Sequence, residues 1–410
     1  MREKKTIIIT SGGMPVPAVQ GGAVQNLVEH LVAENEIEQK MELFIVGPYD
    51  EEADQASKKY VTTKFLWVKI PFFVCLLDKL TYEIVKRFLK KKKSLSARKI
   101  WQTLWYTYNC ALILRKADYD KVVIENGIII CWCLKLFRNY KKYQGKYYLH
   151  YHNVPRFDGK CKDVIQRANK ILCVSSFVAG EIQKSDNPIG PIAKERTCVC
   201  YNGIDIQKFS PKISTDGFKL LKEKYHLSNN QKVILFTGRL SIEKGIYELI
   251  RVLDYLKYKD YKLLIVGASF YGLNIKEEFE KSLKALALKH KDKIVFTGYI
   301  DYNEMPKLYQ IADIVVLPSM WEEPAGLTII EAMACGKIVI TTRSGGILEY
   351  SGNKAAVVIE RDENLICEIA MKIDEVFNDG ITLEQQPRDR AKLFSKRIYY
   401  ENFIQSIGIK

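Results

Sequence analysis

Two basic residues stand on one short stretch of the chain, where they could hold a negatively charged group. Arg239 and Lys244 belong to the segment Gly-Arg-Leu-Ser-Ile-Glu-Lys-Gly at 238–245, which directly follows an apolar run typical of a buried strand. A helix is expected to begin where this segment ends, so the helix dipole and the two charges would act together on a diphosphate. Ordinary surface cations on a solvated loop would give the same pattern.

Two carboxylates follow another apolar run, at 313–317. Glu323 and Glu331 are eight residues apart, and the small residues Ala325 and Gly326 between them predict the start of a helix that contains Glu331. Backbone N–H groups at such a start can approach an anion closely. Because a carboxylate accepts two hydrogen bonds at once, the pair suits two hydroxyl-bearing groups such as a sugar and a ribose. An acidic helix N-terminus that merely favours the dipole is the competing interpretation.

The N-terminal half contributes glycines and histidines. Gly21 and Gly22 precede an expected helix, and glycine there lets the backbone approach a phosphate, although a flexible turn is equally common. His150 and His152 share one face of an expected strand over 146–151, where histidines are more often core or surface residues than catalytic ones. Only His152 stands at the carboxyl end of that strand, so it is the candidate for a site.

Neither a dinucleotide fingerprint nor a metal site is predicted. The chain lacks Gly-x-Gly-x-x-Gly, the Rossmann signature. Asp118-Tyr119-Asp120 resembles a metal-binding Asp-x-Asp motif, but it precedes a strand instead of ending one, and we interpret it as a turn. Cofactors are therefore expected to be none, and metal ligands none.

The elements that must hold these residues alternate between strands and helices. Strands are expected at 5–10, 41–47, 121–126, 146–151 and 170–175, and again at 233–238, 261–267, 293–298, 313–319 and 337–341. This alternation is typical of α/β proteins with parallel sheets, here two Rossmann-like doubly wound domains facing across a cleft. The first domain is expected over 1–208, with a C-terminal helix at 388–410 packing back on it. The second is expected over 209–387, after a linker at 205–217.

The order of these motifs resembles the retaining glycosyltransferases of family 4, which have the two-domain GT-B fold. The matching pieces are Gly21-Gly22, Tyr-His-Asn at 151–153, Tyr-Asn-Gly-Ile-Asp at 201–205, Gly-Arg-Leu with Lys-Gly at 238–245, Glu-x7-Glu at 323–331 and Gly-Gly-Ile at 345–347. The C-terminal half carries the specific motifs. The N-terminal half, which binds acceptors in this family, matches only at single residues.

The resemblance implies a role for each candidate. Arg239 and Lys244 would hold the donor diphosphate, and the backbone N–H groups of Gly326 and Leu327 would cradle it, with Gly21 and Gly22 approaching from the first domain. Glu323 would bind the donor sugar and Glu331 the ribose, Tyr299 and Ile300 would contact the base, and His152 would touch the sugar near the reacting centre. Two departures are Ala325, where an aromatic residue is common, and Gln25, where another polar residue often follows the glycines.

The reaction so implied is metal-independent transfer from a nucleotide-diphosphate sugar, with retention at the anomeric carbon. The cations would stabilise the departing diphosphate. UDP-hexose or UDP-N-acetylhexosamine is favoured as donor, and a glycan or polyprenyl-linked acceptor of bacterial surface polysaccharide synthesis as acceptor. A GDP-sugar-dependent mannosyltransferase and a sugar-nucleotide epimerase on the same fold are alternatives. A non-catalytic scaffold is a further one, but the intact charged residues argue against it.

The charge and the cysteine content limit which partners and which cellular compartment are expected. The net charge is +15, and +10 of it lies between Ile84 and Ala117, where no Asp or Glu occurs. Such local concentration argues against a surface that wraps nucleic acid, so no nucleic-acid partner is expected. Basic residues beside aromatic ones suit an anionic membrane surface, although a solvated lysine-rich helix pair is the alternative. None of the ten cysteines forms Cys-x-x-Cys, which fits a reduced compartment. Together with the basic segment, this predicts a cytoplasmic protein that is peripheral at the inner face of the membrane.

Overall fold

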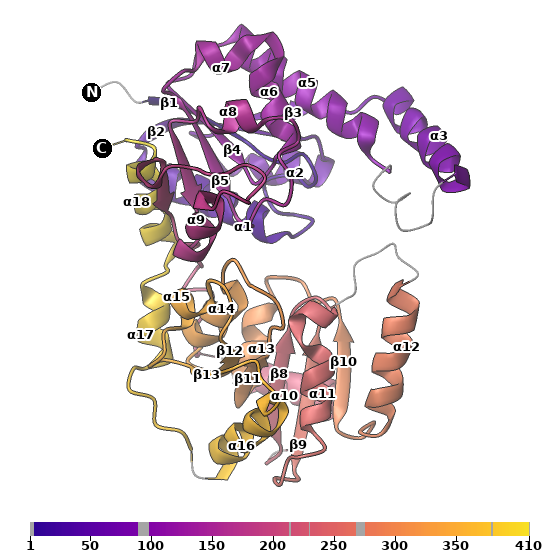
Figure 1. Cartoon of the computed structure of the whole chain (residues 1–410). Helices are drawn as coiled ribbons and strands as arrows, with labels where there is room; N and C mark the ends of the chain where they lie inside the picture. Colours follow the sequence, from indigo (N-terminus) through magenta and orange to yellow (C-terminus); the bar gives the residue numbers. More distant parts are fainter. Residues whose placement is uncertain are drawn as a thin grey trace. The chain divides into compact units, whose positions relative to one another are not determined.

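The computed structural model describes residues 4–88, 98–212, 215–228, 230–267, 275–378 and 380–409. They form two compact units, one of residues 1–203 with 396–410 and the other of residues 204–395 (Figure 1). Residues 89–97, which contain four lysines of the basic segment, lie outside the described residues. Among the described helices, none combines the length and the apolarity needed to cross a bilayer.

The first unit has a parallel sheet in the order β3-β2-β1-β4-β5-β6-β7 within the described residues. Its strands are β1 (Lys4–Ile9), β2 (Met41–Pro48), β3 (Lys64–Val68), β4 (Lys121–Glu125), β5 (Tyr147–Tyr151), β6 (Lys170–Cys173) and β7 (Thr197–Val199). Ile7, Ile8 and Ile9 of β1 are fully buried, because the central strand of a doubly wound sheet is covered on both faces.

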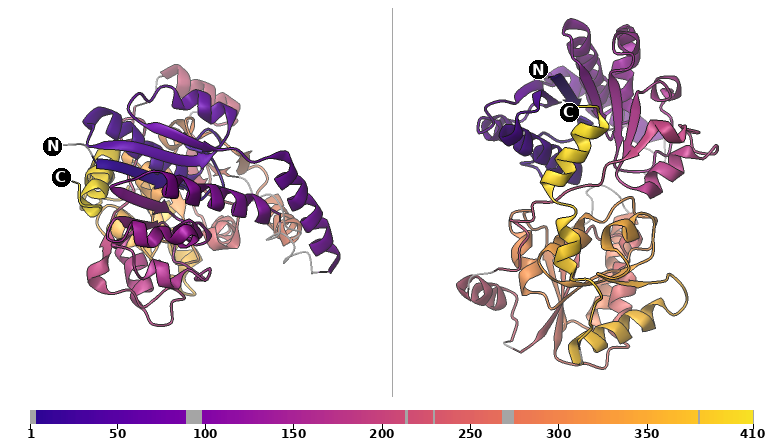
Figure 2. Two further views of the ribbon diagram at one scale, coloured as in Figure 1. Left: turned by 90° about the horizontal axis from the view of Figure 1, so that it is seen from above. Right: turned by 90° about the vertical axis from the view of Figure 1, so that its left-hand side faces the viewer.

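Helices surround this sheet. They are α1 (Ala23–Glu38), α2 (Glu51–Ser57), α3 (Phe72–Phe88), α5 (Ile100–Lys116), α6 (Trp132–Lys135), α7 (Asn139–Lys142), α8 (Lys162–Ile165), α9 (Ser176–Gln183) and α18 (Lys396–Ser406), with 3-10 turns η2 (Ile129–Cys131), η3 (Leu136–Arg138) and η4 (Lys194–Arg196). The C-terminal α18 lies against α1, and the Tyr400 hydroxyl donates to the Asn35 side chain at 2.8 Å (Figure 2).

The second unit repeats the arrangement with the order β10-β9-β8-β11-β12-β13 within the described residues. Its strands are β8 (Lys232–Thr237), β9 (Tyr261–Val266), β10 (Ile294–Gly298), β11 (Ile314–Leu317), β12 (Ile338–Thr342) and β13 (Val357–Ile359). Its helices are α10 (Thr215–Lys224), η5 (Ile242–Lys244), α11 (Ile246–Val252), α12 (Ile275–Leu288), α13 (Met305–Ile311), α14 (Leu327–Ala334), α15 (Ile347–Ser351), α16 (Leu365–Asn378) and α17 (Pro387–Lys392). The predicted α/β class with two parallel-sheet domains is confirmed.

The division between the units differs from the expected boundaries at 208 and 388. Residues 388–395 belong to the second unit, because Arg388 donates to the carbonyls of Phe209 and Ala334 and Arg390 donates to that of Tyr350. The expected linker is also part of this unit, since Phe209 is fully buried within it. Only the last helix, α18, returns to the first unit.

Candidate functional site

An ion pair joins Lys244 to Glu323 in the second unit. Lys244 ends the turn η5 that follows β8, and Glu323 lies in the loop between β11 and α14. The Ser319 hydroxyl donates to the same carboxylate oxygen at 2.8 Å, and Glu323 is only 8% exposed. Because β8 and β11 are neighbouring parallel strands, the loops at their carboxyl ends meet at one edge of the sheet.

A third loop, after β12, closes on the same segment. The Gly346 N–H donates to the Glu323 carbonyl at 2.6 Å, and the Gly345 N–H donates to the Glu322 carboxylate, which also pairs with Arg361. Gly345 has a φ of +48°, and a Cβ there would collide with the Glu323 carbonyl. Glycine is therefore required for this loop to approach so closely. The Glu322 carboxylate holds the loop after β12 in place through its hydrogen bond with the Gly345 N–H.

Helix α14 begins directly behind these loops. Gly326 is its N-terminal cap, and the Ile330 N–H donates back to the Gly326 carbonyl at 3.0 Å. The first N–H groups of an α-helix have no partner within the helix, and they carry the positive end of its dipole. The backbone N–H groups at the start of α14, at Gly326 and Leu327, can therefore donate hydrogen bonds to an anion. They belong to the loop region that also holds Lys244.

Glu331 lies in the second turn of α14 and is buried. One of its carboxylate oxygens accepts from the Tyr302 hydroxyl and the other from the Tyr309 hydroxyl, each at 3.0 Å. Burial raises the pKa of Glu331 to about 7, although the two tyrosine hydrogen bonds act in the opposite direction. Both oxygens expected to bind a ribose are thus engaged by the protein's own hydroxyl groups.

The remaining predicted residues of this unit are more exposed. The Arg239 guanidinium lies 3.7 Å from the Glu243 carboxylate, and both side chains are nearly half exposed. Tyr299 and Ile300 follow β10, and Tyr299 is 67% exposed. Tyr302, further along the same loop, is the residue that reaches Glu331.

In the first unit, Gly21 and Gly22 form the turn before α1. Both have a positive φ, of 74° and 101°, which suits glycine and strains other residues. The Gly21 N–H donates to the Ala18 carbonyl at 2.8 Å, which closes the turn. The buried Gln25 side chain folds back over Gly22 and occupies the space where a Cβ would stand.

His152 belongs to a buried cluster with Glu125 and His150. Nε2 of His152 lies 2.9 Å from one Glu125 oxygen, and Nδ1 of His150 lies 3.1 Å from the other. Burial alone would raise the pKa of Glu125, but the two imidazoles outweigh it and lower the pKa to about 2. Burial lowers the pKa of His152, and the neighbouring His150 adds to this. His152 is only 7% exposed. Its side chain therefore belongs to the buried network and is largely closed to solvent.

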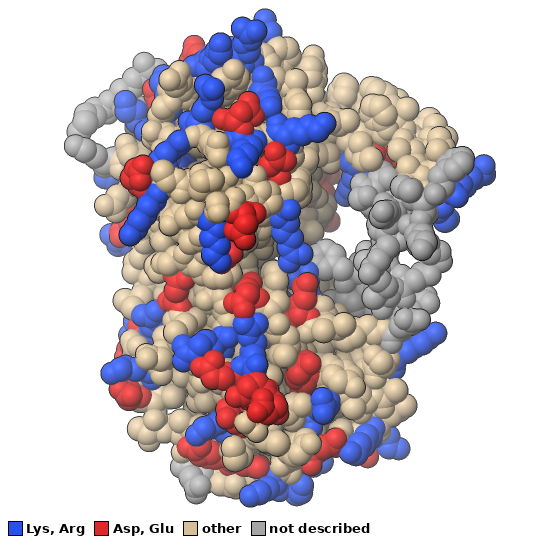
Figure 3. Space-filling view, viewed as in Figure 1, with Lys and Arg blue, Asp and Glu red and all other residues tan. Residues whose placement is uncertain are grey.

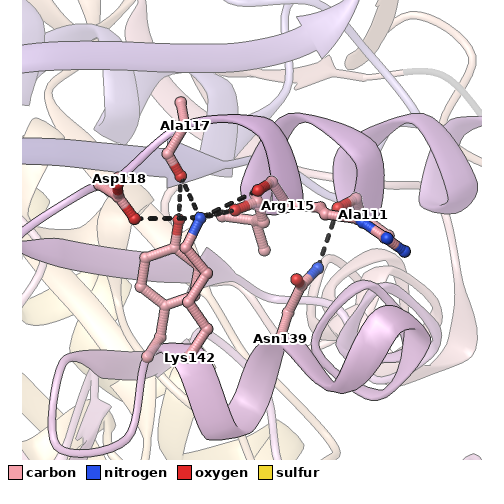
Figure 4. A network of polar contacts seen from close by, with 8 residues as sticks. Ala111, Arg115, Ala117, Asp118, Asn139 and Lys142 are labelled. Atoms are coloured by element: carbon pink, nitrogen blue, oxygen red, sulfur yellow. Dashed lines mark hydrogen bonds and ion pairs between the residues drawn. The ribbon is translucent and has the colours of Figure 1, made fainter.

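Among the described residues, this cluster is the group of three side chains that could hold a metal ion. One nitrogen of each imidazole lies at hydrogen-bond distance from a Glu125 oxygen, whereas Nε2 of His150 and Nδ1 of His152 are buried without a hydrogen-bond partner in the described part of the chain. The three side chains form a buried network in which both carboxylate oxygens are engaged. The aspartates of the Asp118-Tyr119-Asp120 turn have other partners. Asp118 pairs with Lys142 at 3.1 Å (Figure 4), and Asp120 accepts from the Lys5 N–H at 3.0 Å.

Several contacting residues were not predicted from the sequence. Glu125 is the last residue of β4, and it lies opposite His150, the last but one residue of the neighbouring strand β5. The strand pattern therefore carried a signal that could have found Glu125. Ser319 is four residues before Glu323 and directly follows the strand region. Tyr302 carried no such signal, because its contact depends on the path of an irregular loop.

The two parallel-sheet domains have the fold seen in solved structures of the GT-B type. HepE from Anabaena, solved in complex with UDP and glucose, superposes with a TM-score of 0.71 at 16% identity, over 98% of this chain and 99% of that one. Residues 218–394 match the family described as glycosyl transferases group 1. The similarity to this family lies within the second unit and covers less than half of the chain.

Two curated relatives match a similar length of chain. The Bacillus subtilis protein YtcC is 30% identical over 238 residues, which cover 56% of this chain and 57% of the relative. The lipopolysaccharide 1,2-N-acetylglucosaminetransferase of Salmonella typhimurium is 26% identical over 238 residues, 56% of this chain and 58% of the relative. The matches thus span somewhat more than half the length of these relatives.

Proposed function

We propose that this chain is a retaining glycosyltransferase of family 4 that transfers a sugar from a nucleotide-diphosphate sugar to a glycan or polyprenyl-linked acceptor. The observation that carries the proposal is the pairing of Lys244 with Glu323 beside the start of α14. A cation and helix N–H groups suit the diphosphate of a donor, and a carboxylate suits the hydroxyl groups of its sugar. The match of residues 218–394 to group 1 glycosyltransferases supports the same assignment.

In this proposal each residue has one role. Lys244 and Arg239 stabilise the charge that develops on the departing diphosphate, which is the role a metal ion has in other transferases, so no metal is required. Glu323 orients the sugar. The leaving phosphate helps to deprotonate the acceptor, which attacks on the same face of the sugar. The remaining contacts come from the backbone of Gly326 and Leu327, from Glu331 to the ribose, from Tyr299 and Ile300 to the base, and from Gly21, Gly22 and His152 to the diphosphate and sugar.

A uridine donor is proposed on the strength of the relatives. The HepE structure contains UDP and glucose, and the Salmonella relative transfers N-acetylglucosamine. A UDP-hexose or UDP-N-acetylhexosamine is therefore the first donor to test. The same Salmonella relative acts on lipopolysaccharide, which supports an acceptor from bacterial surface polysaccharide synthesis.

The enzyme is proposed to be cytoplasmic and to work at the inner face of the membrane. The segment 84–117 has ten basic residues and no acidic one, which favours an anionic lipid surface. A lipid-linked acceptor would be met at such a surface. A solvated basic helix pair remains the competing account, and vesicle binding separates the two.

A donor panel tests this function. Purified protein is incubated with UDP- and GDP-sugars, with and without a membrane extract as acceptor source, and nucleotide release and thermal shift are measured. We expect UDP-sugars to raise the melting temperature, and UDP to be released in excess of background only with acceptor and also in the presence of EDTA. Glu323→Ala is the inactive control. Preferential stabilisation by GDP-sugars would indicate the mannosyltransferase, and conversion of a donor to its epimer without nucleotide release would indicate the epimerase.

A further inference from the structure

Helix α3 presents a wide apolar face that is largely exposed. At its edge the Phe73 ring packs against the Trp105 ring of α5, with ring centroids 5.7 Å apart. Among the side chains described on α3, only Val74 and Asp78 are buried. Six large apolar side chains are exposed, by 38% to 83%: Phe72, Phe73, Leu76, Leu77, Leu80 and Ile84. At about 100° per residue these six occupy one arc of roughly 140° around the helix.

Helix α5 extends the same surface. Its N-terminal half exposes four residues at helical spacing, namely Ile100, Trp101, Leu104 and Tyr108. Figures 1 and 2 show α3 and this half of α5 projecting together from the rest of the first unit, and Figure 3 shows that the surface there is largely uncharged, with basic side chains at its border. Monomeric soluble proteins rarely expose apolar patches of this extent without a function.

Hydrogen bonds between α3 and α5 hold this face in position. The buried Asp78 carboxylate caps α5 by accepting from the N–H groups of Trp101 at 2.8 Å and Gln102 at 3.1 Å. The Trp101 indole donates to the Thr81 hydroxyl at 2.8 Å, and the Trp105 indole donates to the Lys69 carbonyl at 3.0 Å. The polar groups are thus satisfied inside the pair, so its outer face can remain apolar.

The far end of α5 is fixed to the body of the unit (Figure 4). The Lys142 ammonium donates to the carbonyls of Leu114, Arg115 and Ala117 at 2.6 to 3.0 Å, and so caps the C-terminus of the helix. The Asn139 amide donates to the Ala111 carbonyl at 2.9 Å. The C-terminal end of α5 is therefore anchored to the body of the unit.

The charges around the apolar face favour lipid over protein as its partner. Lys79, Lys86, Arg87, Arg98 and Lys99 lie on or beside the two helices. Of the acids on α3, Asp78 is used as a cap and Glu83 lies 3.9 Å from Lys86. A second copy of the chain would bring two surfaces of equal positive charge together, which costs free energy. Anionic headgroups would meet these cations while the acyl chains receive the apolar side chains.

We infer that the apolar face of α3, extended by Trp101 and Leu104 of α5, inserts into the acyl region of an anionic bilayer. This deepens the membrane association proposed above: it assigns the inserted element, and it makes apolar burial the main source of affinity. Lysine charge then has a secondary role, so binding survives salt that screens exposed charges.

Vesicle sedimentation tests the inference with a double variant, Leu76→Gln with Leu80→Gln, which leaves the net charge unchanged. Vesicles of phosphatidylcholine with phosphatidylglycerol are used at about 0.1 M and about 1 M salt. We expect the wild type to bind at both salt concentrations, and the variant to bind at least roughly tenfold more weakly because apolar contact is lost. The matched control is Ile37→Gln with Val61→Gln, which removes two apolar residues of the same unit that are 72% and 88% exposed and is expected to bind normally.

Insertion depth gives a second, independent measurement. Cys75 and Cys367 are exposed cysteines, and positions 75 and 77 are about 160° apart around α3. In a Cys367→Ser background, an environment-sensitive fluorophore on Cys75 is compared with one on Leu77→Cys in the Cys75→Ser variant. We expect a blue shift and quenching by brominated lipid at position 77, and much smaller changes at position 75.

Three outcomes would overturn the inference. They are equal vesicle binding by the wild type and the Leu76/Leu80 variant, loss of binding at high salt alone, and a solution dimer that the variant dissolves while neither protein binds vesicles. UDP binding by calorimetry is measured on the same proteins. If the wild type binds vesicles but not UDP, the proposed donor fails while the inserted helix stands.

Discussion

The hydroxyl group of Tyr302 lies 3.0 Å from one carboxylate oxygen of Glu331, the residue proposed to bind the donor ribose. Tyr309 holds the other oxygen at the same distance, but the two tyrosines differ in position. Tyr309 is fully buried in the second unit, whereas Tyr302 belongs to the loop after β10. A ribose that binds Glu331 must therefore replace Tyr302 or share the carboxylate with it.

Tyr302→Phe is expected to bind UDP about two- to tenfold more tightly than the wild type, because one oxygen of Glu331 becomes available. Isothermal titration calorimetry measures the affinity. The comparison variant, Tyr309→Phe, leaves a buried carboxylate with one partner fewer and is expected to lose about 1–3 kcal/mol of stability. Weaker UDP binding by Tyr302→Phe would show that the tyrosine contributes to the nucleotide site and does not compete for it.

The raised pKa of Glu331 predicts that the free energy of unfolding depends on pH. Its pKa is raised by burial from 4.5 to about 7, so the folded protein holds this proton more tightly than the unfolded chain does. The stabilising contribution is complete below the unfolded pKa and is lost as the pH rises through the folded pKa, to an extent of at most about 3 kcal/mol. Urea unfolding of the wild type and of Glu331→Gln measures it across this range. The difference in the free energy of unfolding between the two proteins should become smaller with rising pH. A difference that does not change with pH would contradict the prediction.

Lys244→Ala and Glu323→Ala are each expected to lower turnover by about tenfold or more while the protein stays folded. Each change removes one partner of an ion pair and also a proposed donor contact. Steady-state kinetics with circular dichroism as the folding check measures both effects. Lys307→Ala is the matched control, because Lys307 pairs with Glu304 on an exposed helix surface. Turnover near that of the wild type in both site variants would exclude the assignment.

Glu125→Gln is expected to lower the free energy of unfolding at neutral pH by about 3–5 kcal/mol, because it removes the charged partner of two buried imidazoles. The pKa of Glu125 is lowered to about 2, so its contribution is present above the unfolded pKa and is lost as the pH falls toward this value. Chemical denaturation at neutral and acid pH measures both. If the variant had the same free energy of unfolding as the wild type at neutral pH, the Glu125 carboxylate would not be the group that stabilises the two imidazoles.

Metal removal separates this network from a metal site. Since both Glu125 oxygens already lie at hydrogen-bond distance from one nitrogen of each imidazole, treatment with EDTA is expected to leave the melting temperature unchanged. Differential scanning fluorimetry and elemental analysis of the purified protein are the measurements. A stoichiometric metal that is lost together with several degrees of stability would assign Glu125, His150 and His152 as ligands instead.

The strand pattern gave most of the fold, and it failed where the hydrophobic signal is weak. The central strands are continuous apolar runs, and such runs are visible in a sequence. Strand β3 (Lys64–Val68) lies at a sheet edge with most of its residues only half-buried, and β7 (Thr197–Val199) has three residues. Neither was predicted, because a short or edge strand carries little burial pattern.

The candidate site shows the same division. Residues at the ends of predicted strands, such as Lys244 and Glu323, could be identified because parallel topology brings strand ends together. The burial of Glu331 under Tyr302 could not be identified, since it depends on the side-chain path of a loop. The basic and aromatic residues around α3 indicated a membrane surface, but which of them form one apolar face became visible only with the helix itself.

The return of α18 to the first unit has a consequence for synthesis. This helix places Tyr399, Tyr400 and Phe403 in the core of the first unit, and it is translated after the whole of the second unit. The second unit, which ends at Ser395, is therefore complete before the first unit has its final helix. Domains usually fold in the order of translation, but here the unit that is made first must wait for a helix that follows the second unit.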